Sequence, residues 1–254
     1  MLIFIDYFVI NLTAIVLTQN NQETLPVTLS SLKFVSEILV IDDNSSDTTV
    51  KVAKKYGAKV IPHALKGDWS EQRNFALTKA KTDWVLFIDS DEVVTSSLKK
   101  EISRLKPGDT AGYYLKRLDV FCGATLNHGE TGNIKLLRLA RREVGHWIRP
   151  VHEIWQVKGR TKTLTAPLLH IRHFDISTLI SRFDTYSTID AREFSHHPFS
   201  FLSLLKPLAK FVYNYIYLLG FLDGLAGLTF AYLMSFYSLA VRIKTWEIAS
   251  SRSA

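Results

Sequence analysis

Short apolar runs alternate with helical segments through the first hundred residues, and this alternation limits the fold more than any other feature. The apolar runs, rich in β-branched residues, lie at 12–18, 37–43, 58–63 and 84–90. The helical patterns between them lie at 25–34, 50–57 and 69–80. Strands that alternate with helices of about ten residues predict βαβ units, with helices on both faces of a parallel sheet.

Polar clusters follow three of these runs: "TQNN" the first, "DDNSSD" the second and "DSDE" the fourth. Because ligands bind at the carboxyl ends of the strands in such sheets, we expect the three clusters to share one binding edge. The alternation is lost over 108–170, where strand-like runs are divided by Gly-rich "CGATLNHGETGN". We expect these later strands to extend the sheet and complete the site.

The fourth run ends in three carboxylates, Asp89, Asp91 and Glu92. Like charges that are partly buried are costly unless a cation neutralises them. Asp89 and Asp91 are two residues apart, so their side chains point the same way on an extended strand. Oxygen ligands in this arrangement suit Mg²⁺ or Mn²⁺. The alternative is a solvated acidic turn, and the position at the end of a strand favours the metal.

Composition sets broader limits. The 254 residues, 47% of them hydrophobic, suffice for one large domain with an appendage. The single cysteine, Cys122, excludes an internal disulfide framework and fits a reducing compartment. The net charge of +7 is compatible with anionic partners such as phosphates or an acidic membrane surface. Nucleic acid is disfavoured, because no helix-turn-helix, zinc or RNP-type pattern accompanies the charge.

The chain beyond residue 200 is predicted to be a helical tail near a membrane. Asp223 is the only charged residue in 211–241, which is strongly aromatic and flanked by Lys206, Lys210, Arg242 and Lys244. Basic flanks with an aromatic band favour interfacial helices on an anionic leaflet. A spanning helix needs about 20 apolar residues and is the second possibility. A buried helical pair or dimer face is the third, and "GFLDGLAG" predicts a break between two helices.

The motifs "AIVLTQNNQETLPVTLSSL", "EILVIDDNSSDTT", "GDWSEQRNFAL" and "WVLFIDSDEVV" together resemble the inverting glycosyltransferases of family 2. The resemblance is nearest to the lipopolysaccharide core β-1,4-glucosyltransferase subgroup, and "RPVHE" and "GFLDGLAGL" also look like it. It implies an α/β GT-A fold, a Rossmann-like mixed sheet flanked by helices. The domain would cover 12–200, with a nucleotide-sugar-binding half at 12–107 and an acceptor half at 108–200. An apolar extension at 1–11 and a membrane-associating tail at 201–254 would flank it.

The resemblance also implies roles for individual residues. Thr18 would begin the loop around the nucleotide base, although the family more often has Tyr where Gln19 stands here. Asp43 would accept hydrogen bonds from the uracil or ribose. Arg73 would face the diphosphate, unless it is a surface arginine of its helix.

The acidic residues would complete the site. Asp89 would contact the ribose and the metal, and Asp91 would bind the metal directly. The ion, Mg²⁺ or Mn²⁺, would stabilise the leaving nucleoside diphosphate.

An inverting transfer also needs a general base that takes the proton of the acceptor hydroxyl. Glu153 is our first candidate and His152 the second, and the alternative for Glu153 is an ordinary ion pair. Glu92 and Glu130 remain possible bases. His170 would approach the metal or diphosphate, or be structural. The basic residues of 135–149 are interpreted as a surface that steers an anionic acceptor or meets a membrane; they are Lys135, Arg138, Arg141, Arg142 and Arg149.

We therefore expect a metal-dependent hexosyltransferase on the cytoplasmic face of a membrane. The donor would be a nucleotide sugar, UDP-linked, and the acceptor a lipid-linked or other cell-envelope saccharide. One alternative is a glycosyltransferase that uses a polyprenyl phosphate acceptor. Another is a non-catalytic membrane-binding module with a degenerate sugar-nucleotide fold.

Overall fold

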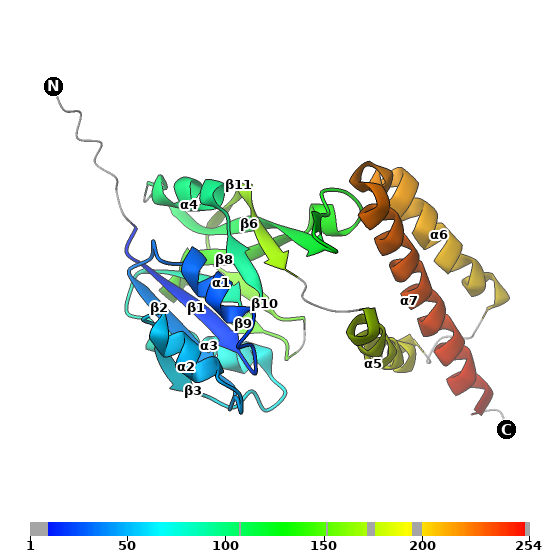
Figure 1. Ribbon diagram of the computed structural model, residues 1–254, viewed down its shortest axis with the longest axis horizontal. Helices are drawn as coiled ribbons and strands as arrows, with labels where there is room; N and C mark the ends of the chain where they lie inside the picture. The colour runs from blue at the N-terminus through cyan, green and yellow to red at the C-terminus, as the bar shows by residue number, and fades with distance from the viewer. Residues whose placement is uncertain (1–9, 107, 151, 172–175, 195–199, 252–254) are drawn as a thin grey trace. The chain divides into compact units, whose positions relative to one another are not determined.

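The structure is a computed structural model that describes residues 10–106, 108–150, 152–171, 176–194 and 200–251. The predicted extension at 1–11 lies almost wholly outside these residues. Contacts divide the chain into two compact units. Unit 1 contains Met1–Arg117 and Ile134–Ile171, and unit 2 contains Leu118–Asn133 and Arg172–Ala254 (Figure 1). The division into nucleotide-sugar and acceptor halves stays a prediction.

The first half of unit 1 has the predicted parallel strands and their connecting helices. The strands are β1 (Leu12–Thr18), β2 (Glu37–Asp42), β3 (Lys59–Pro62) and β4 (Trp84–Asp89). The helices are α1 (Leu25–Ser31), α2 (Thr49–Lys55) and α3 (Trp69–Lys79). All four strands pair in parallel, with β1 between β2 and β4. Every residue of β1 is buried, which explains its continuous apolar run.

The later strands extend this sheet antiparallel, which makes it a mixed sheet as the resemblance implied. They are β5 (Glu92–Val94), β6 (Thr110–Phe121), β8 (Lys135–Arg141) and β11 (Arg160–Ile171). The described sheet runs in the order β3-β2-β1-β4-β8-β6-β11-β5, with β7 (Ala124–Thr125) paired to β6. Strands β9 (Gly145–Ile148) and β10 (Ile154–Val157) form a separate antiparallel hairpin. Helix α4 (Ser96–Ser103) packs against β11.

Two apolar clusters hold unit 1 together, one on each face of the sheet. Leu25 and Leu29 of α1 and Leu98 of α4 belong to the first. Phe87 of β4 belongs to the second, where Trp147 and Trp155 of the β9–β10 hairpin meet it edge to face. The sheet is therefore covered on both sides, and its polar groups gather at the carboxyl ends of β1, β2 and β4.

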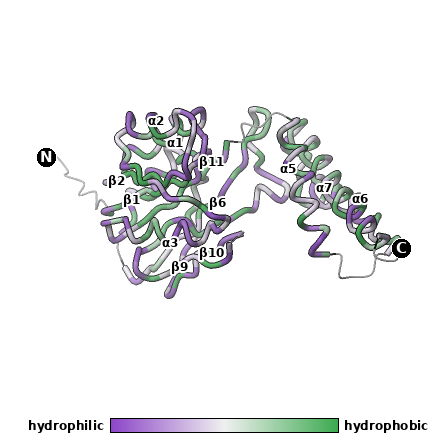
Figure 2. Tube along the Cα trace, turned by 90° about the horizontal axis from the view of Figure 1, so that it is seen from below, coloured by the Kyte–Doolittle hydropathy of each residue, from purple (hydrophilic) through white to green (hydrophobic). Residues whose placement is uncertain are grey.

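Unit 2 is mainly helical. Its helices are α5 (Ile176–Phe194), α6 (Lys206–Val212) and α7 (Gly224–Ser251), with single turns at Phe201–Leu205, Tyr213–Tyr217 and Gly220–Asp223. Helix α7 packs against α5 and α6. Hydrophobic colour extends along α7 in Figure 2. It is long and apolar enough to cross a membrane by length and composition, as the only such helix among the described residues.

The predicted break in the tail separates α6 from α7. Leu219 adopts a left-handed conformation with φ of 59°, and the chain reverses before Gly224. The side chain of Asp223 is buried, with 4% exposed. Its carboxylate accepts from the backbone N–H of His128 at 2.8 Å and pairs with Nδ1 of the same residue, also at 2.8 Å. Asn214, also buried, accepts from the backbone N–H of Glu130 at 3.0 Å. The charge that interrupts the apolar tail is therefore satisfied inside unit 2.

Candidate active site

The loops after β1 and β2 lie side by side at the carboxyl edge of the sheet. Asp43 N–H donates to the carbonyl of Thr18 at 2.9 Å, and Gln19 Nε2 donates to the carbonyl of Asp43 at 3.1 Å. The Asp43 carboxylate accepts from the backbone N–H of Leu65 at 2.9 Å. The structure thus brings together Thr18, Gln19 and Asp43, the residues expected around a nucleotide base.

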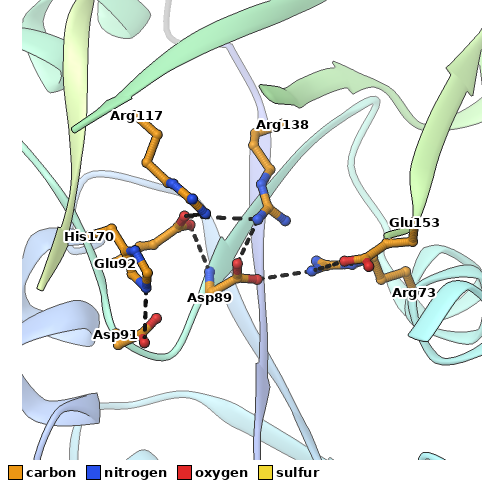
Figure 3. A network of polar contacts seen from close by, with 8 residues as sticks. All are labelled: Arg73, Asp89, Asp91, Glu92, Arg117, Arg138, Glu153 and His170. Carbon is orange, nitrogen blue, oxygen red and sulfur yellow. Dashed lines mark hydrogen bonds and ion pairs between the residues drawn. The ribbon is translucent and has the colours of Figure 1, made fainter. Parts of the chain in front are cut away.

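Asp89, at the end of β4, lies between two arginines (Figure 3). Its Oδ1 accepts from Arg73 at 2.9 Å, and its Oδ2 accepts from Arg138 at 2.5 Å. Burial raises the pKa of Asp89, but Arg138 and Arg73 outweigh this and hold the pKa well below its ordinary value. The cations that neutralise this carboxylate are thus arginines of the protein itself.

Glu92 lies behind Asp89 with none of its side chain exposed. Its Oε2 accepts from the backbone N–H of Asp89 at 3.0 Å, and its Oε1 lies 3.8 Å from Arg138 and 3.9 Å from Arg117. Burial, followed by the charge of Asp89, raises the pKa of Glu92 despite both arginines. Glu92 is therefore placed to hold the end of β4, and its enclosure makes it a poor base for a substrate.

Arg73 connects Asp89 to Glu153. It belongs to α3, whose first turn is capped by Asp68 through a hydrogen bond from the backbone N–H of Glu71. Its Nε donates to Glu153 Oε1 at 3.0 Å, and its guanidinium lies 4.7 Å from the centre of the Trp147 ring. Only 3% of the Arg73 side chain is exposed. Arg73 is thus a buried member of the site and not a surface arginine.

Asp91 and His170 form a second pair, 3.2 Å apart between Oδ2 and Nε2. Asp91 follows β4, and His170 pairs with Glu92 where β11 meets β5. Both side chains are partly exposed, at 26% and 14%. Within the described ranges, no group of three His, Cys, Asp or Glu side chains could hold a metal. Asp91 and His170 are the two side chains that could hold a metal ion at this edge, where phosphate oxygens and water would complete its coordination.

Two other candidates have no contact with this network among the interactions described. His152 is exposed and has a left-handed backbone with φ of 55°. Glu130 belongs to unit 2, where it forms an ion pair with Lys210. Of the predicted bases, Glu153 alone contacts Arg73 among the interactions described.

Arg138 has a different place from the one the sequence suggested. The sequence predicts a basic surface residue, but Arg138 is buried and bound to Asp89. Its neighbour Arg141 packs over the Trp84 ring at 5.1 Å. The motif "LLRLA" indicates this buried position, because the arginine interrupts an apolar strand run. An arginine is almost never fully buried unless it is paired, so the motif also predicts an acidic partner. The role of Arg117 near Glu92 had no such signal.

Comparison with known proteins assigns the family of this chain. The model of Glycosyl transferase family 2 matches residues 13–179, more than half of the chain, and the protein belongs to this family.

The relatives agree with this assignment. Lipopolysaccharide core biosynthesis glycosyltransferase LpsC of Rhizobium meliloti is 24% identical over 242 residues, which cover 87% of this chain and 89% of LpsC. An uncharacterized glycosyltransferase of Rickettsia bellii is 33% identical over 105 residues, or 41% of this chain, and the match spans only 35% of that relative.

Among solved structures, the mannosyltransferase PcManGT of Pyrobaculum calidifontis, in complex with GDP-Man and Mn²⁺, has a TM-score of 0.54. It is 14% identical, and the match covers 93% of this chain and 87% of that one. This likeness supports the GT-A fold.

Proposed function

We propose that this protein is an inverting hexosyltransferase that uses a UDP-sugar and a divalent metal ion. The observation that carries the proposal is the joint placement of Asp89 and Asp91 at the carboxyl end of β4. Arg73 and Glu153 lie on one side of this edge, and His170 lies on the other. This edge thus combines groups for a diphosphate, a metal and a proton transfer.

Asp91 and His170 are the residues that would hold the ion. Mg²⁺ or Mn²⁺ bound there would supply Lewis-acid stabilisation of the leaving diphosphate. Asp89 was expected to share the metal, but both of its oxygens contact arginines here. We propose that Asp89 orients Arg73 and Arg138, whose guanidinium groups suit phosphate oxygens.

Glu153 is the proposed general base, with His152 as the alternative. In the transfer, the acceptor hydroxyl gives its proton to the carboxylate, and its oxygen bonds to the anomeric carbon of the donor. The bond from that carbon to the diphosphate oxygen breaks, which inverts the anomeric centre. The contact with Arg73 orients Glu153 beside the proposed diphosphate position.

We propose a lipid-linked or cell-envelope saccharide as acceptor and the cytoplasmic face of a membrane as location. The likeness to LpsC over most of both chains supports an envelope saccharide. The apolar surface of unit 2 supports membrane association, because only 22% of the most apolar 18-residue stretch of this long helix is buried. A polyprenyl phosphate acceptor is the rival, and its product would partition into organic solvent.

The experiment that tests this function is calorimetric titration of UDP, and then GDP, with and without Mn²⁺. We expect UDP binding that requires Mn²⁺ and that weakens at least tenfold in Asp91→Asn. The matched control is Asp109→Asn, which alters an exposed carboxylate of unit 1 paired with Arg160. An affinity for UDP that is the same with and without Mn²⁺ would contradict the metal site. Absence of binding by both nucleotides would favour a non-catalytic membrane module.

A further inference from the structure

Unit 2 contains a cavity of its own between α5, α6 and α7, with a volume of about 610 Å³. Small-molecule sites occupy roughly 300–1,000 Å³, so this volume is large enough for a ligand. The cavity opens to the surface, because several residues of its wall are exposed: Phe194, Lys206, Ala209 and Tyr213. A ligand can therefore reach these side chains.

Hydrogen bonds between the helices hold the walls of this cavity in place. The Tyr237 hydroxyl of α7 donates to the Asp190 carboxylate of α5, and both residues line the cavity. Ser235 Oγ of α7 donates to the carbonyl of Pro207 in α6 at 2.7 Å. The cavity is thus enclosed by helices that are bound to one another.

The wall of the cavity is positively charged. It carries three cations and two carboxylates, which leaves a net charge of +1. Glu130 forms an ion pair with Lys210, and Asp190 is engaged by the hydroxyl just described. Lys206 and Arg242 line the cavity from α6 and α7, and among the described residues neither pairs with a carboxylate. These two cations are therefore available to a bound anion.

Much of the remaining wall is apolar or aromatic, and includes Phe194, Ala209, Met234 and Val241. The Arg242 guanidinium lies 5.2 Å from the centre of the Phe194 ring, so positive charge and apolar surface are adjacent. A small soluble anion would leave the apolar wall uncovered, and an uncharged hydrocarbon would leave the cations unpaired. An amphiphile with an anionic head group and a hydrocarbon chain satisfies both parts of the wall.

The residues around the cavity indicate the source of this amphiphile. Leu205 and Leu208, close to Lys206 along the chain, are 58% and 63% exposed. Exposed apolar side chains beside basic ones are typical of a membrane interface. The amphiphile that a membrane supplies with this chemistry is a phospholipid of net negative charge.

We propose that this cavity binds one anionic phospholipid of the membrane. The Lys206 ammonium and the Arg242 guanidinium contact its phosphate, and an acyl chain packs along Ala209, Met234 and Val241. The inference rests on the membrane association that is part of the proposed function, and not on sugar transfer. It adds a defined site for a single lipid to the general attraction between basic residues and an anionic surface.

The test is calorimetric titration of the full chain with dihexanoyl phosphatidylglycerol, at concentrations where this lipid is monomeric. Because no bilayer is present, binding reports a site and not attraction to a charged surface. We expect saturation at one lipid per chain. Dihexanoyl phosphatidylcholine, whose choline balances the phosphate, and glycerol 3-phosphate, which lacks acyl chains, should each bind more weakly by about tenfold or more.

Two variants of the wall test the site, and a third is the control. Lys206→Gln should weaken binding of phosphatidylglycerol about tenfold, as for one lost hydrogen bond to a charged group. Ala209→Trp, at an exposed position of the wall, should fill the cavity and prevent binding of either lipid. Arg182→Gln removes an exposed charge of α5 outside the wall and should leave the affinity unchanged.

Several results would overturn the inference: titration without saturation, equal affinity for the two lipids, or equal losses in Lys206→Gln and Arg182→Gln. Unchanged binding in Ala209→Trp would do the same. The UDP titration separates these failures from failure of sugar transfer. If UDP binds and the chain floats with vesicles while the monomeric lipid does not bind, the lipid site alone is wrong. If the lipid saturates one site and neither nucleotide binds, sugar transfer alone is wrong.

Discussion

Glu92 shows how a single buried carboxylate can make stability depend on pH. Its pKa in the folded protein lies above the ordinary value of 4.5. For an acid shifted in this direction, the folded state is favoured at low pH. Stability is then lost as pH rises from about 4.5 through the folded-state pKa.

We therefore expect Glu92→Gln to be more stable relative to wild type at pH 7 than at pH 4.5, by on the order of 1 kcal/mol. The amide oxygen can still accept from the backbone N–H of Asp89. Urea unfolding at pH values from 4.5 to 7.5, in EDTA to remove divalent ions, measures this difference. A difference between the two proteins that stays constant with pH would contradict the prediction.

Arg138 is expected to stabilise the folded state through the same network. Arg138→Met leaves Glu92 buried with a weaker counter-charge and Asp89 with Arg73 alone. Breaking a buried ion pair costs roughly 3–5 kcal/mol, and the partial exposure of Asp89 places this case near the lower figure. Arg160→Met removes an exposed partner of Asp109 and should cost less than about 1 kcal/mol. Equal unfolding midpoints in urea for the two variants would refute the buried network.

At the scale of elements, the turn between α6 and α7 depends on close backbone contact. A Cβ added to Gly227 would lie 2.0 Å from the carbonyl oxygen of Gly220, so the two segments would have to separate. The motif "GFLDGLAG" thus combines a helix break, a buried aspartate and a glycine contact.

Gly227→Ala should therefore destabilise the protein by about 2 kcal/mol or more, although Ala is favoured over Gly inside a helix. Thermal unfolding followed by circular dichroism measures the change. Gly108→Ala is the control, because a Cβ there would meet nothing within 4 Å. An unchanged or raised melting temperature for Gly227→Ala would show that this contact does not hold the turn.

At the scale of the whole molecule, the exposed apolar residues of unit 2 are the feature that bears on membrane association. Large hydrophobic side chains are exposed along 201–225, among them Phe201 at 78%, Leu202 at 71% and Leu225 at 77%. An exposed apolar surface of this extent, with basic residues near it, is typical of membrane attachment. The interfacial interpretation is thus favoured, and spanning and dimerisation are the alternatives.

We expect the full chain to float with vesicles that contain anionic lipid and to be released by alkaline carbonate. Replacement of Phe201 and Leu202 together by Ser should weaken vesicle binding more than tenfold, since each buried side chain contributes about 1.5–3 kcal/mol. Val27→Ser, at an apolar position of unit 1 that is 49% exposed, is the control. If the protein stays with the vesicles after carbonate treatment, the helix spans the membrane. If the protein forms dimers that do not bind vesicles, the apolar surface is a dimer face.

Much of the fold could be predicted from local pattern. The four apolar runs correspond to β1 to β4, and the predicted helices between them correspond to α1 to α3. Local pattern suffices here because apolar residues repeat with different periods in strands and in helices. The short strands β5, β9 and β10 were not foreseen. They are three or four residues long, and their pairing depends on partners distant in the sequence.

The sequence by itself determined the α/β class, the acidic end of β4 and the break in the tail, because each depends on neighbouring residues. Only the tertiary structure decided that Asp89 lies between Arg73 and Arg138, and that Asp91 lies beside His170. These partners are 16, 49 and 79 residues apart in the chain. Charges so distant in the sequence meet only when the sheet forms, and burial then decides which ones must pair.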